Sequence, residues 1–431
     1  MMRTAFPLSS HPALLLLIPG IVLTVLFGLS QGVRADTSGY WVGVISSATA
    51  FTVFSCTFAA LGAALSANRL RRGQITRLAP SRPPLAVAWA ALWPSIALGS
   101  LLQVIGVVIA ATGSWGSPGR VPVEIIFAWM VMIFFHATLG YWLGSVLPTF
   151  LGIPAAVLIS YVWLGFTWSV SFTPLRYLSG LALSGCCAVY AELPWQAPAT
   201  VVLFSAAGIA AFAILLTKTE TRRSVFLRAA MAVSLIAIVA PASLLLARDL
   251  GPYPSPPRTG EDLVCTEEGV SEVCLYPEQL WNPATQNAPV VIATALDRLD
   301  VEGVAVPHRV TASLLTESES TVSLVYRRDF DAATTVNSLM TSITPQRQEG
   351  DICPRDDIDP TPALFASDVA VAAMFVLATG DADSLDAREP EAAAAAAALL
   401  DEEGGSRAAW INDTVRALGD CDLPLPPVPA P

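Results

Sequence analysis

Seven stretches of mostly apolar residues within the first 247 positions constrain this chain more than any other feature. A helix needs about 20 apolar residues to cross the roughly 30 Å hydrocarbon core of a bilayer. A helix on the surface of a soluble protein would show a polar face, and these stretches are too evenly apolar for that. The sequence predicts an α-helical polytopic membrane domain of about seven transmembrane helices at 11–30, 41–66, 85–112, 122–147, 150–170, 199–217 and 229–247.

The distribution of positive charge predicts the orientation of this domain. Ten Arg or Lys side chains fall in segments on the same side as the N-terminus, and three fall in the alternate loops, namely Arg34, Arg120 and Arg176. Positively charged loops stay in the cytoplasm. We therefore expect a multi-pass protein of the cell (plasma) membrane with a cytoplasmic N-terminus and, after seven crossings, an extracytoplasmic C-terminal half.

Two apolar segments admit a second interpretation. Residues 11–30 follow Arg3 and could be a signal peptide, but their apolar part exceeds the usual 7–15 residues. The run 177–190 is short for a crossing, and counting it would place the following basic loop outside. We interpret it as a helical hairpin or re-entrant element on the outer face.

The second half of the chain has the composition of a water-exposed domain. Residues 248–431 contain 11 Arg and 31 acidic residues, whereas residues 1–247 contain 13 Arg or Lys and four acids. An acidic domain is unsuited to nucleic acid, whose phosphates require clustered cations. The predicted domains are 1–247 transmembrane, 248–260 proline-rich linker, 261–422 extracytoplasmic α+β and 423–431 disordered tail.

Within this acidic half, alternating apolar and polar residues at 309–317 and 321–327 predict a β-hairpin. The predicted helices are 289–299, 330–342, 363–379, 389–402 and 408–418. Residues 363–379 are apolar enough to suggest an eighth crossing. Asp368 within them and acidic flanks favour a buried core helix, because a carboxylate at mid-membrane costs about 2.5–3.5 kcal/mol.

Four of the seven cysteines, Cys265, Cys274, Cys353 and Cys421, lie in the acidic half. An even number of cysteines in an oxidising compartment indicates disulfides. Three pairings satisfy this count, and we favour Cys265–Cys274 with Cys353–Cys421. A zinc site is the alternative, although the spacing lacks C-x₂-C pairs and nearby histidine, so we predict no metal and no cofactor.

Motifs for catalysis are missing from the sequence. It contains no phosphate-binding loop for ATP, no H-E-x-x-H and no G-x-S-x-G, and we predict that the chain is not an enzyme. His136 and Gln103 are predicted intramembrane polar residues, where interhelical hydrogen bonds are the usual role. An intramembrane serine protease using His136 is the rarer alternative.

The cytoplasmic segment after the second apolar stretch has a pattern that points to a family. Its basic R-x-R-R-G-x-x-x-x-L motif resembles the coupling-helix region of ABC-2-type exporter permeases. Gly39-Tyr-Trp41, residues 48–54, Cys56, Leu70-Arg-Arg72 and Val273-Cys-Leu-Tyr-Pro-Glu278 are similar to an actinobacterial ABC-permease-like group.

This resemblance implies a permease-like subunit of an export or immunity system, energised by a separate ATP-binding subunit. It also implies a second membrane subunit or a homodimer. The predicted ATPase-coupling loop comprises Arg69, Leu70, Arg71, Arg72, Gly73, Ile75, Arg77 and Leu78. We expect Leu70, Ile75 and Leu78 to enter a cleft of the ATP-binding partner.

Two alternatives remain open. The arginines could serve as a topology signal that contacts anionic membrane lipid. The whole chain could also be a non-transporting membrane protein whose outer acidic domain binds an envelope peptide, lipid or protein partner.

Overall fold

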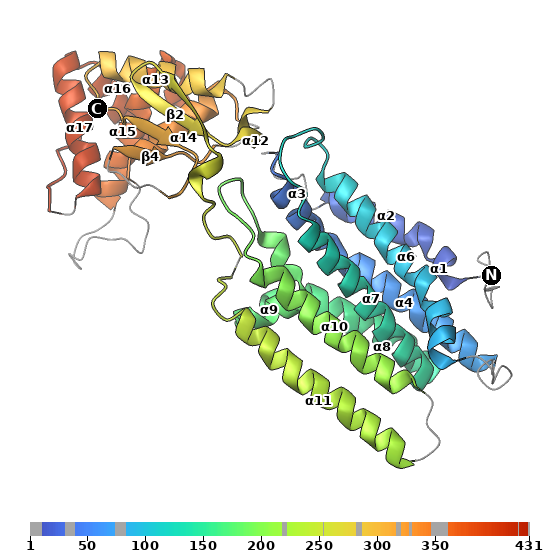
Figure 1. Cartoon of the computed structure of the whole chain (residues 1–431). Helices are drawn as coiled ribbons and strands as arrows, with labels where there is room; N and C mark the ends of the chain where they lie inside the picture. Colours follow the sequence, from blue (N-terminus) through green and yellow to red (C-terminus); the bar gives the residue numbers. More distant parts are fainter. Residues whose placement is uncertain are drawn as a thin grey trace. The chain divides into compact units, whose positions relative to one another are not determined.

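The computed structural model is mostly helical and describes residues 11–30, 39–73, 83–217, 222–252, 254–281, 287–315, 320–326, 330–345, 361–420 and 422–429 (Figure 1). The chain divides into two compact units, Met1–Pro256 and Pro257–Pro431.

The first unit is an all-helical bundle. Its helices are α1 (Pro12–Leu15), α2 (Leu17–Ser30), α3 (Trp41–Ala48), α4 (Thr52–Arg72), α6 (Pro84–Ala110), α7 (Val123–Val146), α8 (Thr149–Gly165), α9 (Thr173–Ser179), α10 (Gln196–Leu216) and α11 (Arg222–Leu246). Short 3₁₀ turns η2 (Thr49–Phe51), η3 (Thr167–Ser169) and η4 (Leu181–Gly185) connect some of them.

The described part of the chain contains six helices long and apolar enough to cross a membrane. Five coincide with predicted stretches: α3 with η2 and α4, then α6, α7, α10 and α11. The other two predicted stretches form shorter helices, because a turn at Leu16 separates α1 from α2 and α8 ends at Gly165. The sixth long apolar helix, Pro362–Thr379, belongs to the second unit.

Residues 177–190 do not form a long helix. The segment contains the end of α9 and the 3₁₀ turn η4, joined at Gly180, whose φ of 79° suits glycine. Tyr177 and Leu183 are fully buried against the bundle. These residues therefore cap the end of the first unit.

The bundle is built around the contact between α4 and α7. Cβ atoms added at Gly140 or Gly144 of α7 would fall on the backbone carbonyls of Ala60 or Ala64 of α4. On the other side of α4, a Cβ added at Gly99 of α6 would lie 2.7 Å from the Ser55 carbonyl oxygen. Small residues thus let three helix backbones approach closely, which is how helices pack in apolar surroundings.

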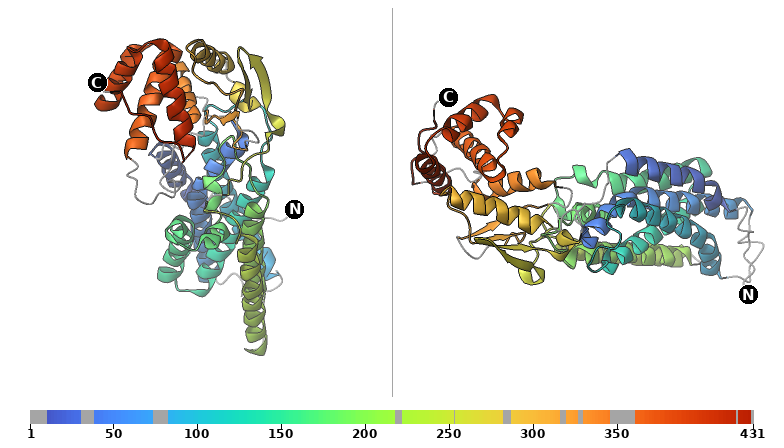
Figure 2. Two further views of the ribbon diagram at one scale, coloured as in Figure 1. Left: turned by 90° about the vertical axis from the view of Figure 1, so that its left-hand side faces the viewer. Right: turned by 90° about the horizontal axis from the view of Figure 1, so that it is seen from above.

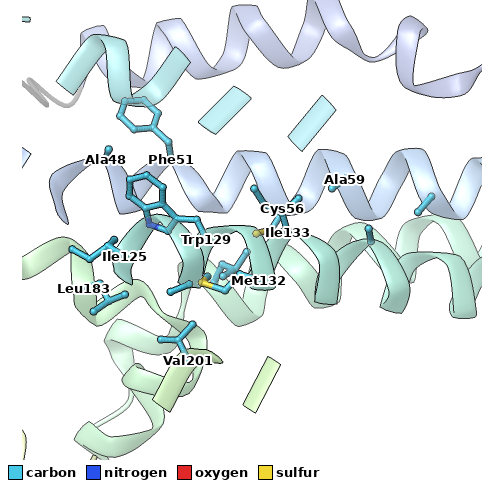
Figure 3. Close-up of a cluster of buried hydrophobic side chains, with 14 of the residues drawn as sticks. Ala48, Phe51, Cys56, Ala59, Ile125, Trp129, Met132, Ile133, Leu183 and Val201 are labelled. Carbon is cyan, nitrogen blue, oxygen red and sulfur yellow. The ribbon is translucent and has the colours of Figure 1, made fainter. Parts of the chain in front are cut away.

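The first long helix is interrupted where α3 meets α4. The 3₁₀ turn η2 redirects the Thr52 N–H to the Thr49 carbonyl, so the Ala48 carbonyl does not receive the N–H four residues on that a continuous α-helix would supply. Figure 3 shows this region, with Trp129 beside Ala48 and Phe51. Phe51 is fully buried, and Gly106 of α6 provides the space for its ring.

The second unit combines a small sheet with helices. Strands β1 (Val264–Glu268), β2 (Ser271–Leu275), β3 (Arg309–Thr311) and β4 (Thr321–Ser323) form one sheet in the order β1-β2-β3-β4. The helices are α12 (Pro277–Leu280), α13 (Ala288–Val301), α14 (Ala332–Ile343), α15 (Thr361–Thr379), α16 (Pro390–Leu400) and α17 (Gly404–Gly419), with 3₁₀ turns η5 (Gly260–Asp262) and η6 (Ala382–Ala387). Five of these helices overlap predicted ones.

The predicted hairpin at 309–317 and 321–327 is wrong. β3 and β4 pair in parallel, with Val310 opposite Val322, and the antiparallel hairpin is instead β1 with β2. Alternation along a strand reports that one face is buried, and it carries no information about the direction of the neighbouring strand.

Helix α15 forms the centre of this unit. It packs against α13, α14, α16 and α17, and Val369, Ala370, Ala373 and Met374 are buried there. Burial raises the pKa of Asp368 on α15, and the nearby Arg388 opposes that shift. These contacts account for the apolar sequence of α15 by packing within the unit.

Both ends of the second unit make specific contacts. Arg258 forms ion pairs with Asp262 at 2.9 Å and Glu278 at 3.3 Å, and its guanidinium lies 4.3 Å from the ring centre of Tyr276. In the predicted disordered tail, the structure describes residues up to 429, and the Trp410 indole donates to the Pro427 carbonyl at 2.8 Å.

The contact between α4 and α7 makes a direct prediction. Gly140→Ala places a methyl group on the Ala60 carbonyl, and such overpacking destabilises by about 1–3 kcal/mol. We expect a lower midpoint of thermal unfolding for the detergent-purified protein. Gly165→Ala is the matched control, because a Cβ there meets nothing within 4 Å. Equal midpoints for the two variants would contradict this packing.

Candidate functional site

The candidate site is the arginine-bearing end of α4. The helix continues through Arg72 and ends at Gly73, so Arg69, Arg71 and Arg72 form its last turn. Cations are favourable there because the helix dipole places partial negative charge at the C-terminus. This local sequence thus supports the helix end that presents the basic cluster.

Two of these arginines bind the turn between α7 and α8. Arg71 donates to the Leu147 carbonyl and, at 3.4 Å, to Asn68 Oδ1. Arg72 donates to Thr149 Oγ1 at 3.2 Å, and Thr149 itself donates to Asn68 Oδ1 at 2.7 Å. Asn68, which is buried, is therefore the common acceptor that joins the end of α4 to the start of α8.

Sequence reasoning missed Asn68 and Thr149. The available signal was a lone amide at the end of an apolar stretch, one residue before the basic motif. An amide there has few partners within its own helix, which favours an interhelical role.

The structure corrects the predicted role of Leu70. We expected this side chain to enter a cleft of a partner, but only 3% of it is exposed and it packs in the main core of the first unit. In the last turn of α4, Leu70 lies on the side of the helix that faces the bundle. Its sequence neighbours Arg69 and Arg71 lie on other faces of the helix. Ile75, Arg77 and Leu78 lie outside the described residues.

Gln103 lies at the break between α3 and α4. Its Nε2 donates to the Ala48 carbonyl at 2.8 Å, and its Oε1 accepts from Ser55 Oγ at 2.9 Å. The Trp129 indole donates to Thr49 Oγ1 at 3.0 Å in the same region. The predicted intramembrane polar residue thus donates a hydrogen bond to the backbone where the first long helix is interrupted.

His136 of α7 contacts Ser160 of α8. The distance from Nδ1 to Oγ is 2.9 Å, and both side chains are buried. A nucleophilic serine needs such a histidine and, in addition, a third group that orients the imidazole. Among the described residues, Ser160 contacts His136 but no carboxylate does, so the pair fits an interhelical hydrogen bond.

The cysteines of the acidic half are partly described. Cys265 and Cys274 face each other on β1 and β2 with their Cα atoms 4.0 Å apart, in a disulfide. Cys353 and Cys421 lie outside the described residues. In the first unit, Cys186 and Cys187 are joined to each other, and Cys56 is a buried free thiol.

Cys265, Cys274 and Glu272 are also close enough together to resemble metal ligands. The guanidinium of Arg309 faces all three, with Nε 3.0 Å from a Glu272 oxygen and 3.2 Å from the Cys274 sulfur. A fixed positive charge in that position would repel a metal ion. The group is better described as a disulfide beside an ion pair.

Comparisons with protein-family models, with curated proteins and with solved structures gave no match. The candidate site therefore depends on its own geometry.

The pair between α7 and α8 predicts non-additive mutations. Ser160→Ala leaves the buried His136 Nδ1 without its partner, which costs about 1–3 kcal/mol. His136→Leu removes the imidazole that needs a hydrogen-bond partner. The double variant should therefore lose less stability than the two single effects added together, by about 0.5–2 kcal/mol. Unfolding of the purified protein measures this cycle.

Ser145→Ala is the matched control, because the Ser145 hydroxyl donates only within α7, to the Trp142 carbonyl at 2.7 Å. Its effect should add to that of His136→Leu without coupling. Additive behaviour of Ser160→Ala would exclude the interhelical hydrogen bond.

The cysteine geometry predicts the thiol content of the mature protein. Without reductant, alkylation should leave the peptides containing Cys265 and Cys274 unmodified, and both should react after reduction. The buried Cys56 should react only after unfolding, with or without reductant. Alkylation of Cys265 in the unreduced, unfolded protein would exclude the pair.

Proposed function

We propose that this chain is a multi-pass membrane protein that serves as the permease-like subunit of an ABC-2-type export or immunity system. The observation that carries the proposal is the connection of the arginine-bearing end of α4 to the α7–α8 turn. A separate ATP-binding subunit would supply energy, and a second membrane subunit or a copy of this chain would complete the pathway.

The exposed surface of the first unit supports membrane insertion. In the apolar window of α11, only 11% of residues are buried within the structure. Phe226, Val233 and Ile238 are each more than 65% exposed on this helix. Figure 2 shows α11 along the edge of the first unit in both views. A bilayer is the solvent in which such a helix needs no further cover.

The position of charge supports an external source of energy. Carriers driven by ion gradients usually have ionisable residues deep within their helices. In the described helices of the first unit, Glu124 lies in the first turn of α7, where it pairs with the exposed Arg120, and the interior polar groups are neutral or histidine. A partner that hydrolyses ATP would meet this requirement.

The contacts at the end of α4 give a route for mechanical coupling. Residues 74–82 follow Gly73 directly, and Asn68, Arg71 and Arg72 hold the start of α8. Movement of the loop would shift α4 and α8 together, and α4 also packs closely against α6 and α7. The proposed surface for contact with the ATP-binding subunit therefore consists of the arginines and the loop, and it no longer includes Leu70.

The experiment replaces two apolar residues of that loop. Ile75→Asp with Leu78→Asp should abolish co-purification with a co-expressed ATP-binding subunit, because two carboxylates would enter an apolar contact. Membrane insertion should persist, since the arginines that set topology remain. The matched control is Val121→Asp, at a 38% exposed position between α6 and α7 on the predicted outer side.

Unchanged co-purification and export in the double variant would exclude this loop as the coupling site. In that case a second function is favoured, in which the acidic unit binds an envelope partner. A groove of about 450 Å³ lies between α14 and the end of β4, lined by Phe330, Val325, Pro345 and the polar Thr334, Asn337, Ser338, Thr341, Ser342 and Thr344.

The hydroxyl groups of this groove already donate hydrogen bonds within the unit. Ser338 donates to the Val325 carbonyl at 2.7 Å, and Thr341 and Ser342 donate to carbonyls of their own helix. Their oxygens remain acceptors. An uncharged surface of acceptors within an acidic half suits the N–H groups of an extended envelope peptide.

A further inference from the structure

We infer that a groove between α9 and the end of α11 binds an anionic lipid of the outer leaflet. One acyl chain would occupy the apolar floor, and the lipid phosphate would bind Arg248. The inference rests on the proposed insertion of the first unit with the end of α11 outside. It adds a ligand and a site to that proposal.

The floor of the groove is apolar and large enough for a lipid chain. It has a volume of about 690 Å³, within the usual range of about 300–1,000 Å³ for ligand pockets. Pro241, Leu244 and Leu245 of α11 form one side, and Phe172 and Pro174 form the other. Phe172 is 54% exposed and Leu245 63% exposed. Burying these surfaces against an acyl chain is favourable by about 25 cal/mol per Å².

Polar groups also line the same groove. Arg248 follows the last residue of α11 by two positions, and Ser171 and Thr173 provide hydroxyls. The combination of apolar side chains, a cation and hydroxyls in one groove matches a lipid with an acyl chain and a phosphate. A guanidinium can donate two parallel hydrogen bonds to a phosphate.

The present partner of Arg248 is weak. Its Nε lies 3.1 Å from Asp249, and the two side chains are 66% and 84% exposed. Exposed ion pairs between neighbours contribute little. Arg248 can therefore exchange this carboxylate for a phosphate.

Arg176 positions the other wall. Its Nε and Nη2 donate to the Val170 carbonyl at 3.1 and 3.0 Å, and its guanidinium stacks 5.4 Å from the Trp168 ring. These contacts fix the turn that carries Ser171 and Phe172. One side of the groove is thus the turn fixed by Arg176, and the other side is the end of α11.

The location favours a lipid over a soluble ligand. α11 is the most exposed of the long apolar helices, so a ligand that diffuses within the bilayer reaches the groove directly. The cation follows the last turn of an apolar helix, which is the depth at which head groups lie.

The experiment uses the full chain purified from membranes in a mild detergent and analysed by native mass spectrometry. Phosphatidylglycerol and phosphatidylcholine with identical chains are added in equal amounts. We expect selective retention of phosphatidylglycerol, and a loss of at least fivefold in that retention for Arg248→Gln. Arg120→Gln is the matched control, because Arg120 is also on the predicted outer side and pairs with an exposed acid at 3.2 Å.

A second variant tests the chain-binding part. Leu244→Trp fills the groove and should lower retention of phosphatidylglycerol at least fivefold, whereas Leu203→Trp at an exposed position of α10 should leave it unchanged. Glycerol phosphate, which has the charge without the acyl chain, should not compete.

Equal retention of the two lipids, equal loss in Arg248→Gln and Arg120→Gln, or full competition by glycerol phosphate would each overturn the site. These outcomes are separate from the proposed function. Co-purification with an ATP-binding subunit tests the permease, and recovery of the chain in the membrane fraction tests insertion.

Discussion

The close approach of α4 and α7 is the interaction on which the first unit depends. Gly140 and Gly144 have no Cβ, so the backbone of α7 lies directly on the carbonyls of Ala60 and Ala64. In an apolar solvent the hydrophobic effect does not hold helices together, and contacts of this kind take its place. Everything else in the bundle is positioned relative to this pair.

Several polar contacts follow from that packing. With α7 fixed against α4, the α7–α8 turn comes within reach of Arg71 and Arg72, and Asn68 can accept from Thr149. α6 approaches the other side of α4 at Gly99, which brings Gln103 to the interrupted helix. These buried polar groups are therefore paired with one another or with backbone, as an apolar interior favours.

Much of the helical content could be predicted from the sequence because apolar length is a local property. The five long helices of the first unit match predicted stretches, and the predicted helices of the acidic half overlap α13 to α17. The favoured Cys265–Cys274 pairing agrees with the structure, in which the β1–β2 hairpin brings these two residues together. Properties that depend on a residue distant in the sequence were harder to predict. The apparent hairpin at 309–327 proved to be two parallel strands, and Leu70 proved to be buried.

The sequence by itself determined which segments are apolar, where charge accumulates and how the chain divides into a basic and an acidic half, because each of these depends only on composition along the chain. The tertiary structure decided which polar residues meet. Ser160 faces His136 across 24 positions, Asn68 faces Thr149 across 81, and the lipid-sized groove joins α9 to residues near 245. Such pairs form only where helix backbones approach closely. The glycines allow this approach because they have no side chain to occupy the space between the helices.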